Sequence, residues 1–278
     1  MLNTNMALTD LQFSSILTSL ANLPLQDPDK CLQQAIFLRN RTARTRRGPC
    51  LEPFWLHPRF QAWAQSPSSA LIMVQGTFAG QAAMKDCLVN IIEQIRLANA
   101  TALWALKTSS PSASPSLTTV ELLKYLTSQA LRQGPPPTER SLTLSCARFQ
   151  SARDECEWIA LLAASLANLG HVFLVVDIEL LVPETCASPG GFTLPLSIAE
   201  LFLRLGRSSP STVVKVMLVS YGSPLFGAIS DAGTKKQLLL AGKRKPQRPV
   251  GKAPSGRNAR FGRGRLRRGL GFEQAIQN

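Results

Sequence analysis

The chain has 278 residues, and 45% of them are hydrophobic, which is enough for a sizeable core and excludes a wholly disordered protein. Lys and Arg outnumber Asp and Glu by 31 to 17, so the formal net charge is +14, which indicates nucleic acid, acidic proteins or an anionic membrane surface as partners. No run reaches the roughly 18 apolar residues of a membrane span, and the N-terminus lacks the basic and apolar regions of a secretory signal.

The positive charge lies mostly in one segment. Residues 235–278 contain thirteen Lys and Arg and one acid, Glu273, whereas residues 1–234 contain 18 basic and 16 acidic residues. The cysteines form no CxxC pair and have no histidine at metal-ligand spacing, so we expect reduced thiols, no metal site, and a location in the cytoplasm or nucleus. They are Cys31, Cys50, Cys87, Cys146, Cys156 and Cys186.

Residues 1–49 are predicted to form an N-terminal helical segment. Leucines and isoleucines recur at near-helical spacing across residues 8–22, and a second helix is expected to begin at Asp27-Pro28, a capping residue followed by proline. This second helix leads into five arginines that either form a solvated face or contact phosphates or acidic surfaces. They are Arg39, Arg41, Arg44, Arg46 and Arg47.

Residues 50–234 are predicted to form one α/β domain. Four short, nearly unbroken apolar runs alternate with helical patterns, and such runs are typical of strands that are buried on both faces of a parallel sheet. We therefore expect a doubly wound, mainly parallel sheet. The expected strands are 70–75, 100–106, 171–177 and 213–220, and the expected helices are 82–97, 117–132, 155–169 and 196–205.

The segment after the first expected strand resembles a phosphate-binding loop without its polar groups. In a P-loop, glycines allow backbone N–H groups to surround phosphates, a lysine neutralises them, and the next Ser or Thr holds Mg²⁺. Here Gly76 and Gly80 lie between strand and helix, one residue too close together. Gln81 takes the place of the lysine, and Ala82 takes the place of the magnesium ligand.

The third expected strand has the pattern of a Walker B strand, because its apolar residues end in a carboxylate, Asp177. Such a carboxylate binds magnesium through water. An aspartate at a strand end also serves as an ordinary helix cap, so both interpretations of Asp177 stand. The second acid, which would position the attacking water, is displaced by one residue to Glu179.

Taken in order, these segments resemble the STAND-type NTPases of fungi, in particular their NACHT-like, nephrocystin-like P-loop modules. The resemblance covers roughly residues 54–222 and implies a sheet of P-loop NTPase type. It also implies that Ser220 ends a sensor strand, where Tyr221 replaces the arginine that often follows. The segments that carry it are Phe60-Gln61-Ala62-Trp63, Leu71–Gly80, Leu103-Trp104-Ala105-Leu106, Leu122–Leu131, Val172–Asp177 and Lys215–Ser220.

The departures from this family predict a pseudoenzyme. Without the lysine and the hydroxyl we expect no catalytic residue and no cofactor, although the glycine turn and helix N-terminus could hold ATP and magnesium weakly. The leading hypothesis is a catalytically inactive NTPase-like domain that acts as an intracellular interaction or regulatory module for a protein partner. Another hypothesis is a weak ATPase that uses Asp177 and Lys85, which lies one helical turn beyond Gln81.

Residues 235–278 are predicted to be a disordered basic tail. Residues 243–248 have the charge density of a nuclear-import signal, and residues 257–268 interleave arginine with glycine as flexible RNA-binding segments do. The alternative function is therefore nucleic-acid association through the tail, and a solubilising extension without a partner is the remaining interpretation. The residues concerned are Lys243, Arg244, Lys245, Arg248, Arg257, Arg260, Arg263, Arg265, Arg267 and Arg268.

Other catalytic arrangements are not expected. The two histidines, His57 and His171, lie in no recognisable metal or triad pattern, so we expect both to have structural roles. The segment Ser220-Tyr221-Gly222-Ser223 lacks the glycine that precedes the serine of a nucleophile elbow.

Overall fold

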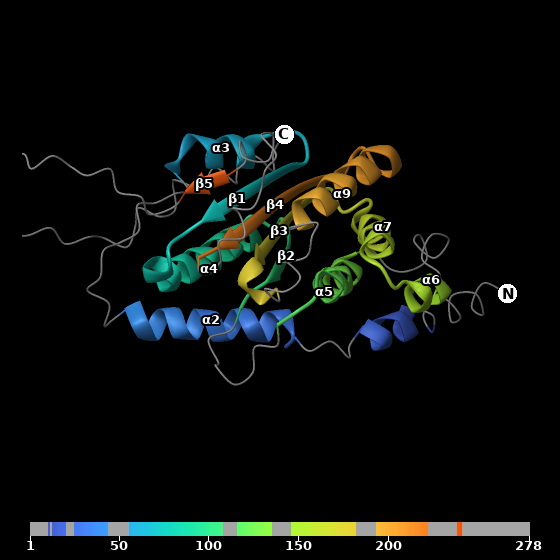
Figure 1. The fold of residues 1–278 in the computed structure, drawn as a ribbon, viewed down its shortest axis with the longest axis horizontal. Helices are drawn as coiled ribbons and strands as arrows, with labels where there is room; N and C mark the ends of the chain where they lie inside the picture. Colours follow the sequence, from blue (N-terminus) through green and yellow to red (C-terminus); the bar gives the residue numbers. More distant parts are fainter. Residues whose placement is uncertain are drawn as a thin grey trace, which may run out of the picture.

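The computed structural model describes residue 11 and residues 13–20, 25–43, 56–107, 116–134, 146–181, 193–221 and 238–240. Within these residues, five strands form one sheet in the order β2-β3-β4-β1-β5, and every strand pair is parallel (Figure 1). The expected α/β class with a parallel sheet is confirmed. The strands are β1 (Ala70–Gln75), β2 (Thr101–Ala105), β3 (His171–Asp177), β4 (Val213–Ser220) and β5 (Leu238–Leu240).

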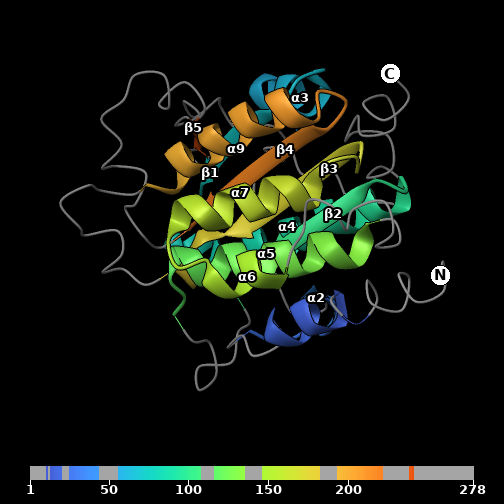
Figure 2. The same ribbon diagram turned by 90° about the vertical axis from the view of Figure 1, so that its right-hand side faces the viewer.

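Helices cover both faces of the sheet (Figure 1, Figure 2). Successive residues of a strand point to opposite faces, so each apolar run supplies two cores. Val74 and Phe173 pack with α2, α3 and α4 on one face, and Leu103 and Val176 pack with α5, α7 and α9 on the other. The helices are α2 (Pro28–Ala43), α3 (Pro58–Gln65), α4 (Gln81–Leu97), α5 (Thr119–Gln133), α6 (Cys146–Ser151), α7 (Glu155–Leu166) and α9 (Leu194–Ser208), with 3₁₀ turns η2 (Phe78–Gly80) and η4 (Ile178–Leu180).

Polar side chains mark the starts of three helices. The expected start at Asp27-Pro28 is confirmed, and Asp27 Oδ1 accepts a hydrogen bond of 3.0 Å from the N–H of Asp29. Helices α5 and α7 begin with capping boxes, formed by Thr118 with Glu121 and by Asp154 with its N3 glutamate. Each box satisfies backbone N–H groups that a helix start otherwise leaves without partners.

The N-terminal segment is part of the α/β body. Helix α2 packs on α4, where Arg39 Nη1 lies 2.5 Å from Glu93 Oε2 and 2.6 Å from Asn90 Oδ1. Leu32 of α2 is buried in the core beside α4, and Ile16, in the helical residues 13–20, is buried in the opposite core. Arg39 is therefore a packing contact between two helices. Arg44, Arg46 and Arg47 lie outside the described residues.

The folded part extends past residue 234, where the tail was expected to begin. Strand β5 pairs in parallel with β1, with Val74 opposite Leu239, and the Leu239 side chain is buried. Three consecutive leucines are too short a run to predict a strand from sequence, but they complete the sheet beside β1. Residues 241–278, and with them the basic residues of the import and RNA-binding patterns, lie outside the described residues.

Two glutamines of α5 satisfy the backbone of the edge strand β2. The Gln129 amide accepts a hydrogen bond of 3.0 Å from the Trp104 N–H and donates one of 2.9 Å to the Trp104 carbonyl. Gln133 donates to the carbonyl of Ala102 at 2.9 Å. An open strand edge is a template for pairing with another chain, so these side chains close this edge of the sheet.

Candidate functional site

The carboxyl ends of β3, β4 and β1 lie side by side, because these strands are neighbours in the sheet. Asp177 ends β3, Ser220 ends β4, and Gly76 follows β1 and donates a hydrogen bond of 2.7 Å to the Ser220 carbonyl. Helix α4 follows β1 on one face, and α9 follows β3 on the other. Ligands of open parallel sheets bind at such a divergence, beyond the strand ends. The structure thus brings the expected site positions together.

The turn between β1 and α4 does not form a phosphate cradle. A cradle requires consecutive N–H groups that point inward, usually with a residue in the left-handed conformation. Gly80 has φ −90° and ψ 0°, and among the described glycines only Gly170 has a positive φ. The N–H groups of Gly76, Gly80 and Gln81 donate to Ser220, Thr77 and Phe78 respectively, within the turn and its neighbouring strand.

Gly76 has a packing role in place of a phosphate-binding one. A Cβ atom at this position would lie 2.9 Å from Cε of Met84, which is buried under the turn. Ala82, at the position of the magnesium ligand, carries no group that could bind a metal. The turn therefore packs closely on α4 and offers little to an anion.

Asp177 is only 1% exposed, and both its carboxylate oxygens accept hydrogen bonds. Oδ1 accepts from the N–H of Glu179 at 3.1 Å, and Oδ2 accepts from the Tyr221 hydroxyl at 2.5 Å and from the Lys107 N–H at 3.3 Å. Burial raises the pKa of Asp177 to about 6, against the hydrogen bond from Tyr221 and the nearby charge of Lys85, which lower it. The carboxylate is engaged by the protein itself.

Glu179 is held across the ends of β3 and β4. Its Oε1 accepts a hydrogen bond of 2.8 Å from the Ser220 hydroxyl and one of 3.0 Å from the N–H of Tyr221. Its backbone carbonyl accepts from Lys107 Nζ at 2.7 Å. The displaced acid and the sensor-like serine are thus paired with each other.

Lys85 reaches the same cluster from α4. Its Nζ lies 5.7 Å from the centre of the Tyr221 ring. Burial lowers the pKa of Lys85, while the charges of Asp177 and Glu179 act in the opposite direction. The pKa of Tyr221 is raised mainly by burial and also by Asp177, and a hydrogen bond with the Gln81 side chain lowers it. Gln81 and Lys85 therefore both face the tyrosine.

Sequence reasoning missed two members of this cluster, Lys107 and Tyr221. Tyr221 was recognised only as the replacement of an arginine, and Lys107 follows β2, which is separated from β1 in the sheet by β3 and β4. Their position within two residues of a strand end is the one signal that could have indicated them, because those ends meet at the same edge of a parallel sheet.

The other polar candidates have structural roles or lie elsewhere. His57 Nδ1 accepts a hydrogen bond of 3.2 Å from the N–H of Arg59 and caps α3, and His171 begins β3. Among the described residues there is no cluster of three His, Cys, Asp or Glu side chains that could hold a metal ion. Cys31, Cys87 and Cys156 are free thiols.

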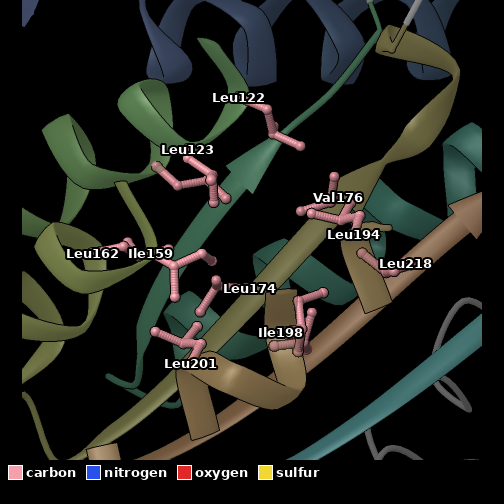
Figure 3. A pocket seen from close by; sticks show the side chains of 12 residues that line it. Leu122, Leu123, Ile159, Leu162, Leu174, Val176, Leu194, Ile198, Leu201 and Leu218 are labelled. Atoms are coloured by element: carbon pink, nitrogen blue, oxygen red, sulfur yellow. The ribbon is translucent and has the colours of Figure 1, made fainter. Parts of the chain in front are cut away.

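A small apolar gap lies between the sheet and the helices α5, α7 and α9 (Figure 3). Leu123, Ile159 and Ile198 point into it from the three helices, and Leu174 and Val176 from β3. Its volume of about 10 Å³ is the space of one water molecule, and no polar group lines it. It is a packing defect of the core and too small for a ligand.

Comparison with known proteins identifies no relative of this chain. No protein-family model matches it, and neither a curated protein nor a solved structure does. In the part of the chain that the structure describes, no helix is both long and apolar enough to cross a membrane. The class that the fold defines is an α/β domain with a parallel sheet.

Proposed function

We propose that this chain is a P-loop NTPase-like domain of the STAND and NACHT kind that hydrolyses no nucleotide and acts as an intracellular interaction or regulatory module. The observation that carries the proposal is the closed cluster at the strand ends. The groups that would contact nucleotide and magnesium in an active enzyme contact one another, with Tyr221 on Asp177 and Ser220 on Glu179.

Energetic considerations support an inactive site. A phosphate would find neither a lysine at position 81 nor free N–H groups at Gly76 and Gly80. Magnesium would have to displace the Tyr221 hydroxyl from Asp177, and a hydrogen bond to a charged group contributes about 1.5–3 kcal/mol. Loss of one electrostatic contact to a transition state lowers a rate by about 10²–10³, and several contacts are missing here.

We expect calorimetric titration of the full chain with ATP or ADP, with or without magnesium, to give no binding up to about 1 mM ligand, equivalent to less than about 4 kcal/mol. The variant Gln81→Lys/Ala82→Thr should also fail to bind, because the N–H groups of Gly76, Gly80 and residue 81 remain engaged within the turn and its neighbouring strand. Magnesium-dependent binding by the native chain at micromolar concentration would contradict the proposal.

A second candidate, a weak ATPase, is favoured by one observation, the position of Lys85 beside Tyr221 and Asp177. In this case the lysine would neutralise phosphate from α4. Magnesium-dependent phosphate release in the same samples, lost in both Asp177→Ala and Lys85→Ala, would replace the inactive module with this enzyme.

The third candidate is nucleic-acid binding through the tail, favoured by the eleven Lys and Arg residues after residue 242. Deletion of residues 243–278, which keeps β5, should abolish binding to single-stranded RNA in a filter or fluorescence assay. In the full chain the affinity should fall steeply as salt rises, because phosphate neutralisation releases counterions. Binding that survives both the deletion and high salt would contradict this function.

A further inference from the structure

Helix α9 is apolar on two opposite sides. One side is buried against the sheet and α7 through Leu194, Ile198, Leu201 and Leu205. On the other side the side chains of Leu196 and Leu203 are 66% and 57% exposed. Helix α7 lies between α5 and α9, so α9 is the outer helix of its layer (Figure 2). A surface helix normally has one apolar side, so the second requires an explanation.

The outer side of α9 has the spacing of a coiled-coil seam. Leu196, Ala199, Leu203 and Gly206 follow one another at intervals of three, four and three residues, the a and d positions of a heptad. We call these four residues the α9 seam. Large and small side chains alternate along it, and Ala199 and Gly206 are exposed like the two leucines.

The packing of the described residues does not require glycine at position 206. A Cβ atom there would meet nothing within 4 Å, and its φ is outside the left-handed region, so neither a close contact nor the backbone requires glycine. Glycine in a helix costs up to about 1 kcal/mol relative to alanine. A contact with another molecule would explain the residue.

We propose that the α9 seam binds a second copy of this chain, with the two α9 helices antiparallel about a two-fold axis near Leu201. This arrangement places Leu196 on the partner's Gly206 and Ala199 on the partner's Leu203, and the two-fold repeats both pairs. Every layer then matches a large residue with a small one. A parallel pairing would set leucine on leucine in two layers and would set alanine on alanine and glycine on glycine in the others, which leaves gaps in the layers of small residues.

The charges beside the seam fit the same arrangement. Arg204 Nε lies 2.8 Å from Glu200 Oε1 in an ion pair, and the two side chains are 34% and 42% exposed. Along the antiparallel axis, the partner's Glu200 lies between Glu200 and Arg204. Each Arg204 can therefore pair with carboxylates of both copies.

The size of the contact sets its strength. A helix of 15 residues is about 22 Å long, and a single helix pair buries less than the roughly 1,600 Å² of a standard interface. We therefore expect a weak dimer with a Kd on the order of tens of micromolar.

Sedimentation equilibrium of the full chain in about 0.3 M salt, which screens the +14 charge, tests the proposal. The native mass should rise toward that of a dimer with concentration. Leu203→Glu should remain monomeric, and Leu97→Glu, a control with a leucine that is 69% exposed on α4, should dimerise like the native chain. Gly206→Leu, which fills the space of the partner's Leu196, should weaken the dimer at least tenfold without lowering the melting temperature.

Two results would overturn the proposal. The first is a native chain that stays monomeric up to several hundred micromolar, well above the Kd expected for one helix pair. The second is a dimer that Leu203→Glu and Gly206→Leu leave unchanged, because its interface would then lie elsewhere. Melting temperatures of both variants equal to the native value exclude misfolding as the cause of a lost dimer.

Discussion

The variant Asp177→Asn is expected to be more stable than the native chain at pH 7, by about 1–2 kcal/mol, and less stable below pH 4. The pKa of Asp177 is about 6 in the folded state and near 3.9 in the unfolded chain. The folded state thus retains a proton that the unfolded state loses, so stability falls as pH rises from about 4 to 6. The difference between these two pKa values corresponds to a stability cost of about 3 kcal/mol at pH 7. Asp177→Asn avoids this cost, but an impaired hydrogen bond reduces the gain by about 1 kcal/mol.

Urea denaturation at pH 3 to 7 measures this effect. Asp29→Asn is the matched control, because Asp29 lies on the surface in an exposed ion pair with Arg96, and its replacement should change stability by less than about 0.5 kcal/mol. If Asp177→Asn is the less stable chain at every pH, the carboxylate is stabilised by its surroundings and the interpretation of the cluster is wrong. The expected gain at pH 7 would mean that the buried carboxylate is kept at a cost to the fold.

The main strands could be predicted from the sequence because their information is local. A strand buried on both faces is a continuous apolar run, and the expected runs 171–177 and 213–220 coincide with β3 and β4. Strand β5 could not be predicted, since three leucines become a strand only beside β1. The packing of α2 on α4 through Arg39 likewise depends on contacts between residues about 50 positions apart.

The candidate site could be predicted only in part, for a similar reason. Asp177 and Gly76 were indicated by their own strand and turn patterns. The roles of Tyr221 and Lys107 depend on the strand order, which sets the ends of β2 and β4 on either side of Asp177. Whether Gln81 borders an empty site or a filled one is decided by these neighbours. The sequence shows which residue stands at position 81, and it could not predict which side chains fill the space beside it.

Stability is expected to rise between about pH 8 and pH 10 because of Lys215, by at most about 3 kcal/mol. Lys215 is 2% exposed in β4, and its Nζ donates hydrogen bonds to the carbonyls of Ser66 and Ser68, the latter at 2.7 Å. Burial lowers the pKa of this lysine to about 8, against about 10.4 in the unfolded chain. Between these values the unfolded state binds the extra proton, so raising the pH favours the folded state.

Denaturation at pH 7 to 10 should show this rise in the native chain and in Lys30→Met, a control on the exposed side of α2, and not in Lys215→Met. At pH 7, Lys215→Met removes the free-energy cost of a buried charge, but it also leaves the carbonyls of Ser66 and Ser68 without this donor. Because the two effects oppose each other, the net change in the free energy of unfolding should be small, about 1 kcal/mol. If the native chain, Lys30→Met and Lys215→Met all show the same pH dependence, the Lys215 ammonium is hydrated and does not cause the rise in stability. The expected result would instead establish Lys215 as the side chain that fastens β4 to the turn before β1, and so aligns the two strands whose far ends form the candidate site.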